Sequence, residues 1–261
     1  MRARGVSSPG PLTDAQVASF GRDGFVRIDA LTDGAELEVL LAVYDDLFSR
    51  EGGFDAGDRI DLVPGEDRSA LPQIVNPERY APRLVEGRAY RNAREIAAQL
   101  LGPGCLPTGN HAILKPPHVG GATPWHQDEA YWDPAFAHRG VSIWLALQPA
   151  TVANGCMRFI PGSHRGPVLP HELVSADTHG LRATEMPPDA RETICELPAG
   201  GATLHDGRTL HAAGPNVSGR PRRALVFGFG LAPVPLATPN DYPWQRPEWY
   251  AHAANRSTRT R

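Results

Sequence analysis

The sequence predicts a mainly β protein with flanking helices, in which an antiparallel sandwich or barrel follows a helical lead-in. After Gly104, short apolar or alternating segments rich in branched residues are separated by Gly, Pro and Asn, a texture typical of antiparallel folds. The 261 residues are 41% hydrophobic, which is enough for a substantial core in one large domain. We therefore expect a single domain over residues 1–261, with the lead-in over about 13–104 and the β core over about 105–231.

The lead-in begins with clear helix signals. Thr13 and Gln16 have the spacing of a capping box, which predicts a short helix that ends near Gly21–Gly24. The segment "FVRI" that follows resembles a strand. From Asp33 onward, apolar residues recur at helical spacing, which predicts a helix with one buried face. These residues are Leu37, Leu40, Leu41, Tyr44, Leu47 and Phe48.

The rest of the lead-in alternates between loop and helix. Residues 50–80 are rich in Gly, Asp and Pro and are expected to be mostly loop, whereas a further helix should run from about Arg83 to Leu101 and stop at Gly102. The helices would brace the outside of one sheet, and a ligand would bind at the mouth of the sandwich. The predicted strands are "HAILK", "SIWLALQPA", "MRFIP", "TICELP", "GATLHDG" and "RRALVFGFG". Residues 161–191 show no clear strand and are expected to form a lid loop.

Charge and composition restrict the possible partners. The formal net charge of −3, the pI of about 6.4 and the 7% aromatic content argue against a nucleic-acid partner. Three widely spaced cysteines do not form a disulfide framework, which favours a cytoplasmic protein. No signal peptide or transmembrane segment is recognisable. We expect a monomer or homodimer that acts on a small molecule, away from membranes.

The stretch "PWHQDEAYW" at 124–132 contains a candidate metal site. His126 and Asp128 are two positions apart, and such residues on a strand point to the same face. An imidazole nitrogen and a carboxylate oxygen suit a divalent metal such as iron. Chance proximity is the alternative, because the chain has ten histidines and aspartate is common.

A third ligand and an anion-binding residue are predicted in the segment 204–227. His211 and Arg222 lie symmetrically about a turn at 216–217, so a hairpin would place them on adjacent strands. A buried arginine needs an anionic partner, which a ligand that also touches the metal would supply. His205 is the alternative third ligand. Arg220 and Arg223 are the alternative cations, although strand alternation turns Arg223 to the opposite face.

Four segments occur in the order and spacing of a known family: "WHQD" at 125–128, "SIWLAL" at 142–147, "NGCMRFIPGSH" at 154–164 and "DGRTLHAAGPNVSGRPRR" at 206–223. From about Lys115 to Phe229 the chain resembles the phytanoyl-CoA dioxygenase family of non-haem iron oxygenases that consume 2-oxoglutarate. The resemblance implies a double-stranded β-helix (a cupin-like jelly roll) and a need for Fe(II), 2-oxoglutarate and O2. It also implies oxidation, most often hydroxylation, of a small molecule, coupled to conversion of 2-oxoglutarate to succinate and CO2.

The resemblance also assigns roles to residues. His126, Asp128 and His211 match the family's iron ligands, and Arg222 matches the arginine that pairs with the far carboxylate of 2-oxoglutarate. Three further residues match neighbours of the cosubstrate: Trp144, for which plain core packing is the alternative, His111, and Gln73 at a position where relatives often carry a lysine. Ala213 departs from the family, which often has a serine there. Related halogenases lack the aspartate, so Asp128 argues against halogenation.

The substrate pocket is less well marked in the sequence. Tyr131, Trp132, Phe136 and His164 are candidate substrate contacts, with core or turn packing as the alternative for each. Desaturation, cyclisation and epimerisation remain alternatives to hydroxylation, and the substrate can be free or carrier-bound. A non-catalytic jelly roll and a metalloenzyme that uses no cosubstrate are the rival functions. Neither rival gives a reason to bury Arg222.

Overall fold

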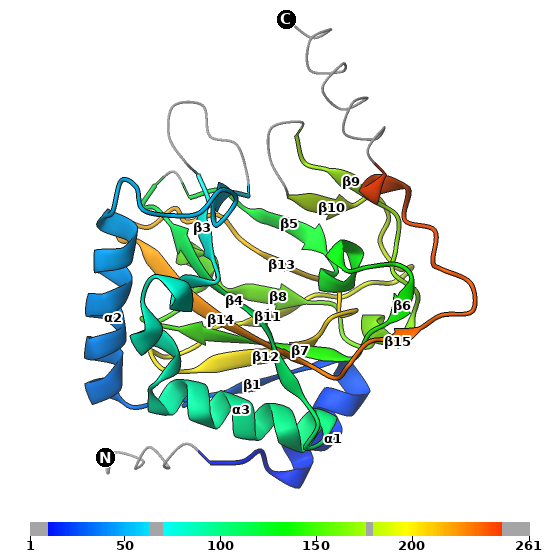
Figure 1. Cartoon of the computed structure of the whole chain (residues 1–261), viewed down its shortest axis with the longest axis horizontal. Coiled ribbons are helices and arrows are strands. Elements are labelled where there is room, and N and C mark those ends of the chain that lie inside the picture. The colour runs from blue at the N-terminus through cyan, green and yellow to red at the C-terminus, as the bar shows by residue number, and fades with distance from the viewer. Residues whose placement is uncertain (1–9, 63–69, 119, 176–179, 247–261) are drawn as a thin grey trace, which may run out of the picture.

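The computed structural model describes residues 10–62, 70–118, 120–175 and 180–246, and two facing antiparallel sheets make up its centre (Figure 1). The larger sheet has the strand order β1-β12-β7-β14-β4-β3-β2, and the smaller has the order β11-β8-β13-β5. This arrangement is mainly β with few helices, as the sequence predicts, and it is the jelly roll that the resemblance implies. Lys115 and Phe229, the approximate limits of the resemblance, both lie on strands of the larger sheet.

The strands of the larger sheet are, in spatial order, β1 (Phe25–Ile28), β12 (Ala202–Asp206), β7 (Gly140–Ala146), β14 (Arg222–Gly230), β4 (Leu106–Lys115), β3 (Pro72–Val75) and β2 (Arg59–Asp61). Those of the smaller sheet are β11 (Thr193–Cys195), β8 (Met157–Phe159), β13 (His211–Ala213) and β5 (Thr123–His126). Two small pairs complete the strands: β9 (His171–Leu173) with β10 (Leu181–Ala183), and β6 (Phe136–Ala137) with β15 (Val234–Pro235).

The helices are α1 (Asp14–Asp23), α2 (Gly34–Ser49) and α3 (Arg88–Leu101). Short 3-10 helices are η1 (Pro77–Arg79), η2 (Pro82–Val85), η3 (Asp128–Tyr131), η4 (Val152–Asn154), η5 (Ser163–Arg165) and η6 (Pro243–Gln245). In the part of the chain that the structure describes, no helix is long and apolar enough to cross a membrane.

The predicted capping of α1 is confirmed. Thr13 accepts a hydrogen bond from the backbone N–H of Gln16, and the Gln16 side chain accepts one from the backbone of Thr13. The helix ends at Gly24, whose φ of 82° is left-handed. Glycine is required there for a second reason, because a Cβ would lie 2.4 Å from Nδ1 of His164.

The third helix begins later than the sequence predicts. Instead of one helix from about Arg83, the chain forms η2 and then restarts as α3 at Arg88. The start is fixed from outside, because the carboxylate of Glu36 on α2 accepts hydrogen bonds from the backbone N–H groups of Arg88 and Ala89. This tertiary cap satisfies free N–H groups of the first turn and favours negative charge there, and no local signal in the sequence shows it.

Three other segments refine the sequence-based expectations. Most of the described residues of 50–80 lie outside helices and strands, as expected, but the range also contains β2, β3 and η1, and β3 extends the larger sheet by pairing with β4. The strand expected at "HAILK" starts earlier, at Leu106. Residues 161–191 contain η5 and the β9–β10 pair, so they are not free of strands; their role as a lid stays a prediction. The pairing of β3 with β4 joins segments that lie far apart in the sequence, which local patterns do not show.

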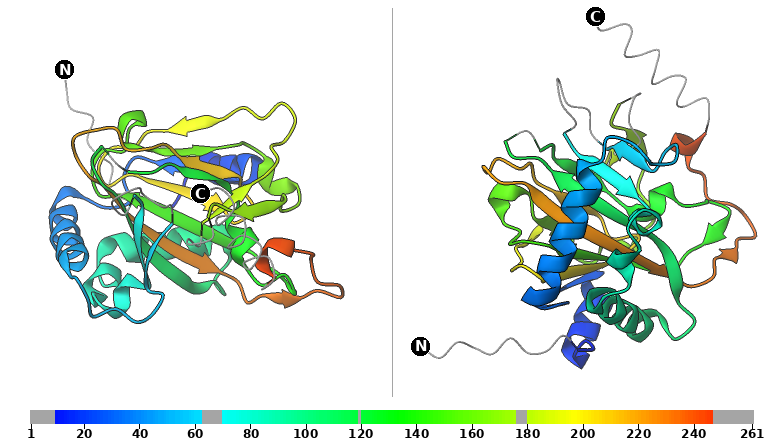
Figure 2. Two further views of the ribbon diagram at one scale, coloured as in Figure 1. Left: turned by 90° about the horizontal axis from the view of Figure 1, so that it is seen from above. Right: turned by 60° about the vertical axis from the view of Figure 1, so that its left-hand side comes forward.

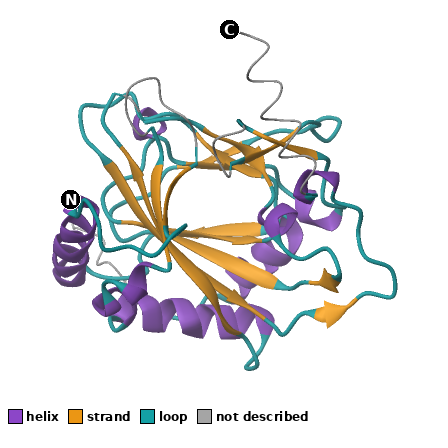
Figure 3. Cartoon of the chain, turned by 45° about the horizontal axis from the view of Figure 1, so that its top comes forward, coloured by secondary structure: helices purple, strands orange, loops and turns teal. Residues whose placement is uncertain are grey.

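Strand alternation divides the core into two layers. On β14, Leu225, Phe227 and Phe229 face the helices, while Arg222 and Val226 face the space between the sheets. Figures 2 and 3 show α2 and α3 on the outside of the larger sheet, as expected, with the smaller sheet on its other side. The interior between the sheets is thus left for a ligand. All three cysteines are buried free thiols.

The β9–β10 pair supports the segment that follows β5. The backbone N–H of Gln127 donates to Nε2 of His171 (3.2 Å), while Nδ1 of His171 bonds to the carbonyl of Leu169 (2.7 Å). On the same side, the backbone N–H of Leu181 donates to the hydroxyl of Tyr131 (2.7 Å). His171 must be neutral to accept the first bond, and burial lowers its pKa to about 4.

This histidine gives the fold a pH dependence. Because the pKa of His171 is about 4 in the folded chain and about 6.5 in an unfolded one, the unfolded chain binds the proton first as pH falls. Stability from this site is present above pH 6.5 and is lost between pH 6.5 and 4, by about 2 kcal/mol from pH 7 to pH 5. Urea unfolding should show a smaller loss between these pH values for His171→Gln than for the natural chain, and equal losses would contradict the assignment.

Candidate active site

A cavity of about 620 Å³ lies between the two sheets. Its walls come from the inner faces of strands in both sheets and from residues 131–133 and 138–140 beside β6. At its inner end the antiparallel pairing of β5 and β13 places His126 directly opposite His211. Among the described residues of 161–191, none lines this cavity.

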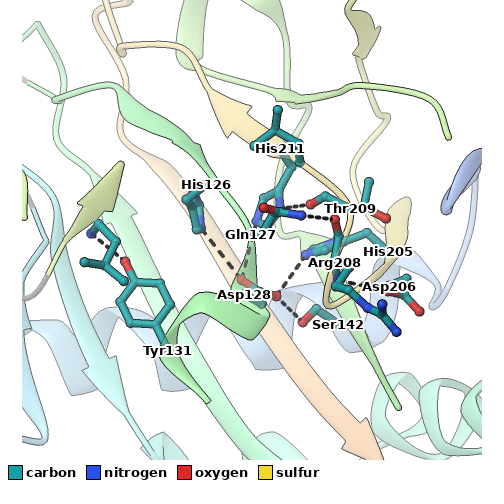
Figure 4. Close-up of polar contacts among 12 residues, drawn as sticks. His126, Gln127, Asp128, Tyr131, Ser142, His205, Asp206, Arg208, Thr209 and His211 are labelled. Carbon is teal, nitrogen blue, oxygen red and sulfur yellow. Dashed lines mark hydrogen bonds and ion pairs between the residues drawn. The ribbon is translucent and has the colours of Figure 1, made fainter. Parts of the chain in front are cut away.

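Three side chains converge at this end (Figure 4). Oδ1 of Asp128 lies 3.7 Å from Nε2 of His126 and 3.5 Å from Nε2 of His211. One ligand atom from each residue lies within 4.8 Å of the others. The structure therefore brings together the three residues that the sequence singles out, in an arrangement that can hold a metal ion.

The route to this convergence differs from the one inferred from the sequence. Strand β5 ends at His126, and Asp128 is the first residue of η3, so the two side chains do not share a strand face. The turn between them is fixed by Gln127, whose Oε1 accepts from the N–H of Leu169 (2.7 Å) and whose Nε2 donates to the carbonyl of Arg208 (2.8 Å). The buried Gln127 is a supporting residue that the sequence reasoning missed.

Backbone carbonyls orient both histidines in the same way. Nδ1 of His126 lies 2.8 Å from the carbonyl oxygen of Pro124, and Nδ1 of His211 lies 2.8 Å from that of Thr209. Since a carbonyl only accepts, each Nδ1 carries the hydrogen and each Nε2 keeps a free lone pair. Hydrogen bonds of this kind, from the ring nitrogen that faces away from the metal, fix the tautomer of metal-binding histidines.

Burial and neighbouring charges set the protonation of the three groups. Burial lowers the pKa of His126, and it lowers the pKa of His211 well below its ordinary value, so both imidazoles are neutral at pH 7. Burial alone would raise the pKa of Asp128, but His211, His205 and His126 outweigh it and hold that pKa well below the usual range. Two neutral imidazoles and a carboxylate form a donor set that suits a divalent metal.

Arg222 lies in the same interior, and the described residues place no carboxylate beside it to pair with its guanidinium. Its side chain is 1% exposed, and its Nε and Nη1 make no hydrogen bond within the described residues. The guanidinium carbon lies 5.1 Å from the ring centroid of Trp144. Burial lowers the pKa of Arg222 to about 10, so it is still charged at pH 7. Unpaired buried donors in a planar fork fit a carboxylate that enters the cavity.

Comparison with known proteins gives this geometry a family. A sequence profile described as phytanoyl-CoA dioxygenase (PhyH) matches residues 20–224. The chain belongs to this family. Its members are Fe(II)- and 2-oxoglutarate-dependent dioxygenases, and the chain is accordingly an enzyme of that class.

Three known proteins are similar to this chain to different degrees. EvdO2 from Micromonospora carbonacea var. aurantiaca, solved in complex with 2-oxoglutarate, is 40% identical over 91% of this chain and 98% of its own, with a TM-score of 0.80. A probable alpha-ketoglutarate-dependent hypophosphite dioxygenase of Stutzerimonas stutzeri is 30% identical over 173 residues, 64% of this chain but only 60% of that protein. The epimerase SnoN from nogalamycin biosynthesis, solved with Fe3+, alpha ketoglutarate and nogalamycin RO, shares the fold at 22% identity over 84% of this chain and 83% of its own (TM-score 0.71).

The other candidate site residues predicted from the sequence divide into two groups. Trp144, His111 and Gln73 line the cavity, and the side chains of Gln73 and His111 touch across β3 and β4. Tyr131 and Trp132 line it as well. Phe136 and His164 do not line it: Phe136 pairs with β15, and His164 lies over Gly24.

Arg223 lies on the outer face, as alternation along β14 predicts. Its guanidinium pairs with Asp45 on α2 at 2.6 Å, which leaves Arg222 as the inward-facing cation of this strand. A second buried cation, Lys115, stands opposite Arg222 on β4. Its Nζ donates to the carbonyls of Gly121 (2.7 Å), Gly214 (2.6 Å) and Ala213 (3.3 Å). Lys115 has no donor left for a ligand, and nothing in the sequence marked it.

Substitution of the two histidines tests whether they bind Fe(II). His126→Ala and His211→Ala should each lower Fe(II) affinity at least 100-fold, because each removes a ligand whose lone pair is already oriented. His164→Ala, which changes a histidine outside the cavity, is the matched control and should bind Fe(II) like the natural chain. Anaerobic titration with Fe(II) measures the affinities; loss of binding in the control, or its retention in either ligand variant, would show that the site lies elsewhere.

Proposed function

We propose that the chain is an Fe(II)- and 2-oxoglutarate-dependent dioxygenase that hydroxylates a small molecule, with His126, Asp128 and His211 as the iron ligands. The observation that carries this proposal is the pair of orphaned buried donors on Arg222 in the same cavity as the three converging ligand atoms. When iron, 2-oxoglutarate and O2 are bound, they couple oxidative decarboxylation of 2-oxoglutarate to oxidation of a substrate carbon.

The residues fit the metal by their chemistry. Both imidazoles present a bare Nε2 to one point, and Asp128 presents Oδ1 to the same point, which gives the neutral and anionic donors that iron accepts. Three protein ligands would leave further coordination positions for 2-oxoglutarate and O2. A non-catalytic jelly roll would need neither the oriented lone pairs nor the unpaired arginine.

Arg222 binds the distal carboxylate of 2-oxoglutarate in this proposal. A dicarboxylate can reach the metal with one end and the guanidinium with the other, where its oxygens would accept hydrogen bonds from donors that have no partner among the described residues. Trp144 covers the guanidinium and forms one wall of this part of the cavity. His111 and Gln73 form a second wall from β4 and β3. Ala213, also in the wall, contributes no hydrogen bond from its side chain.

The remaining cavity indicates the size of the substrate. A volume of about 620 Å³ is that of a site for a drug-sized molecule, and 2-oxoglutarate fills only a part of it. Trp132 forms an outer wall and lies against Gly140 and Gly207, where an added Cβ would come within 3.1 Å and 2.3 Å of its ring. We infer that this held indole packs against the substrate.

The outcome of oxidation is proposed to be hydroxylation. SnoN, which has the same fold, is named as an epimerase, so desaturation, cyclisation and epimerisation are the alternatives within this chemistry. In this proposal the target carbon would lie near the three converging ligand atoms, in the part of the cavity that 2-oxoglutarate does not fill. Localisation in the cytoplasm, a monomeric or dimeric state, and closure by residues 161–191 remain predictions.

Arg222→Met separates cosubstrate binding from metal binding. The substitution keeps much of the volume and removes the charge, so Fe(II) should still bind while the affinity for 2-oxoglutarate falls by about 2–5 kcal/mol. Arg222→Lys should restore a part of this, because a point charge cannot make the bidentate contact. Anaerobic titration, followed by the metal-to-ligand charge-transfer absorption, measures the affinity.

The matched control for that titration is Arg223→Met, which removes the neighbouring cation on the outer face and should bind 2-oxoglutarate like the natural chain. If Arg222→Met also titrates like the natural chain, another residue anchors the cosubstrate. If the natural chain shows no charge-transfer band, the oxygenase proposal itself fails.

Trp132→Ala tests the substrate wall. With a substrate found by screening for stimulated succinate release, this change should raise the KM for that substrate about tenfold, or ~1.4 kcal/mol. The affinity for 2-oxoglutarate should not change. Phe136→Ala removes an aromatic ring of the same segment that lies outside the cavity and should leave both values unaltered. A larger effect at Phe136 than at Trp132 would place the substrate elsewhere.

A further inference from the structure

Two side chains of the larger sheet contact Oδ2 of the proposed iron ligand Asp128, the oxygen that does not face His126 and His211. Oγ of Ser142 donates to Oδ2 of Asp128 at 2.8 Å, and Nε2 of His205 lies 3.3 Å from the same oxygen. Ser142 on β7 and His205 on β12 are direct cross-strand partners. The contacts are drawn in Figure 4, where Asp128 lies between these two residues and the two histidine ligands.

Asp128 needs such support more than the other ligands do. His126 and His211 lie on paired strands, and each ring is held by a carbonyl of its own strand segment. Asp128 lies beyond the end of β5, on the first residue of η3. The sheet therefore does not fix the direction of its carboxylate. Only Oδ1 faces the two proposed ligand histidines, His126 and His211.

His205 has the opposite hydrogen placement from the ligand histidines. A hydrogen bond across this 3.3 Å contact requires Nε2 of His205 to carry the hydrogen, because a carboxylate only accepts. Its Nδ1 is buried without a hydrogen-bond partner among the described residues. An imidazole nitrogen that carries a hydrogen cannot also bind a metal, so His205 is excluded as a ligand through this nitrogen although its ring lies 4.3 Å from that of His211.

We propose that Ser142 and His205 form a positioning pair that occupies Oδ2 of Asp128 and so restricts this carboxylate to one-oxygen ligation through Oδ1. This inference rests on the proposed function. The number of open coordination positions depends on this restriction. A carboxylate that turned to bind through both oxygens would take one of the positions that 2-oxoglutarate and O2 require. The pair therefore keeps the site open as well as holding the ligand.

The test uses the metal-loaded protein without substrate, so that it reads the site rather than turnover. His205→Leu and Ser142→Ala remove one donor each, His205→Gln keeps an N–H that can reach Oδ2, and the double variant removes both. Thr203→Val is the matched control, since Thr203 is a buried residue two positions from His205 on β12 whose hydroxyl has no partner in the described residues. Co(II) replaces Fe(II), because its visible absorption depends on how its ligands are arranged.

We expect His205→Leu to weaken Co(II) affinity about 10–100-fold and to change the visible absorption spectrum per bound ion. Ser142→Ala should act in the same direction. His205→Gln should recover most of both signals, and the double variant should lose less affinity than the two single losses added together, because both donors act on one oxygen. Thr203→Val should match the natural chain. Near-ultraviolet circular dichroism checks that each variant is folded.

The possible results distinguish failure of the positioning pair from failure of the proposed function. If the natural chain binds neither Co(II) nor Fe(II), the proposed function fails. If it binds the metal, but folded His205→Leu and Ser142→Ala keep its affinity and spectrum, the positioning pair is disproved. Weaker binding with an unchanged spectrum and no recovery in His205→Gln would also overturn it, because that result describes general loosening of the core.

Discussion

The pairing of β5 with β13 is the interaction on which the site depends. These strands are short, and their register sets His126 directly across from His211. A slip of one residue would turn one of the imidazoles to the opposite face of the sheet. The surrounding contacts resist such a slip: β8 pairs with the other side of β13, and the side chain of Gln127 ties the chain after β5 to two distant backbone segments.

The two buried cations between the sheets, Arg222 and Lys115, differ in how far their hydrogen-bond donors are paired within the described residues. Arg222 and Lys115 are neighbouring buried cations, and burial and Arg222 both lower the pKa of Lys115. Three carbonyls take up the donors of Lys115, whereas Arg222 has orphaned donors and no carboxylate beside it in the described residues. Burying a cation this way is costly unless an anion arrives. A carboxylate that binds beside Arg222 would therefore relieve this cost, which favours its binding.

Much of this arrangement could be predicted from the sequence, and the parts that could not share a physical cause. The capping box of α1, the inward direction of Arg222 and the choice of His211 follow from local spacing or alternation. The start of α3 and the existence of β2 and β3 depend on distant partners, such as the Glu36 carboxylate, that no short window contains. The position of Asp128 is instructive, because its carboxylate lies beside His126 and His211 although the strand argument for placing it there is wrong.

The same limit applies to the support of the site. Ser142 and His205 become partners only when β7 and β12 are paired, and Lys115 is marked only by the carbonyls that surround it. Residues that bind a ligand belong to recognisable motifs, but those that hold the binding residues are chosen by tertiary geometry. A serine within an apolar strand and a histidine in a competing position carry no signal of their own.

Strand β5 lies at the edge of the smaller sheet, and this has a thermodynamic consequence. An ion shared by His126 and His211 would tie the edge strand to its neighbour across 211 − 126 = 85 residues of chain, much as a disulfide closes a long loop. The entropy removed from the unfolded chain by such a cross-link grows with loop length. Metal loading would thus protect the edge of the smaller sheet most, while the seven-stranded layer, braced by its helices, would hold together without the ion.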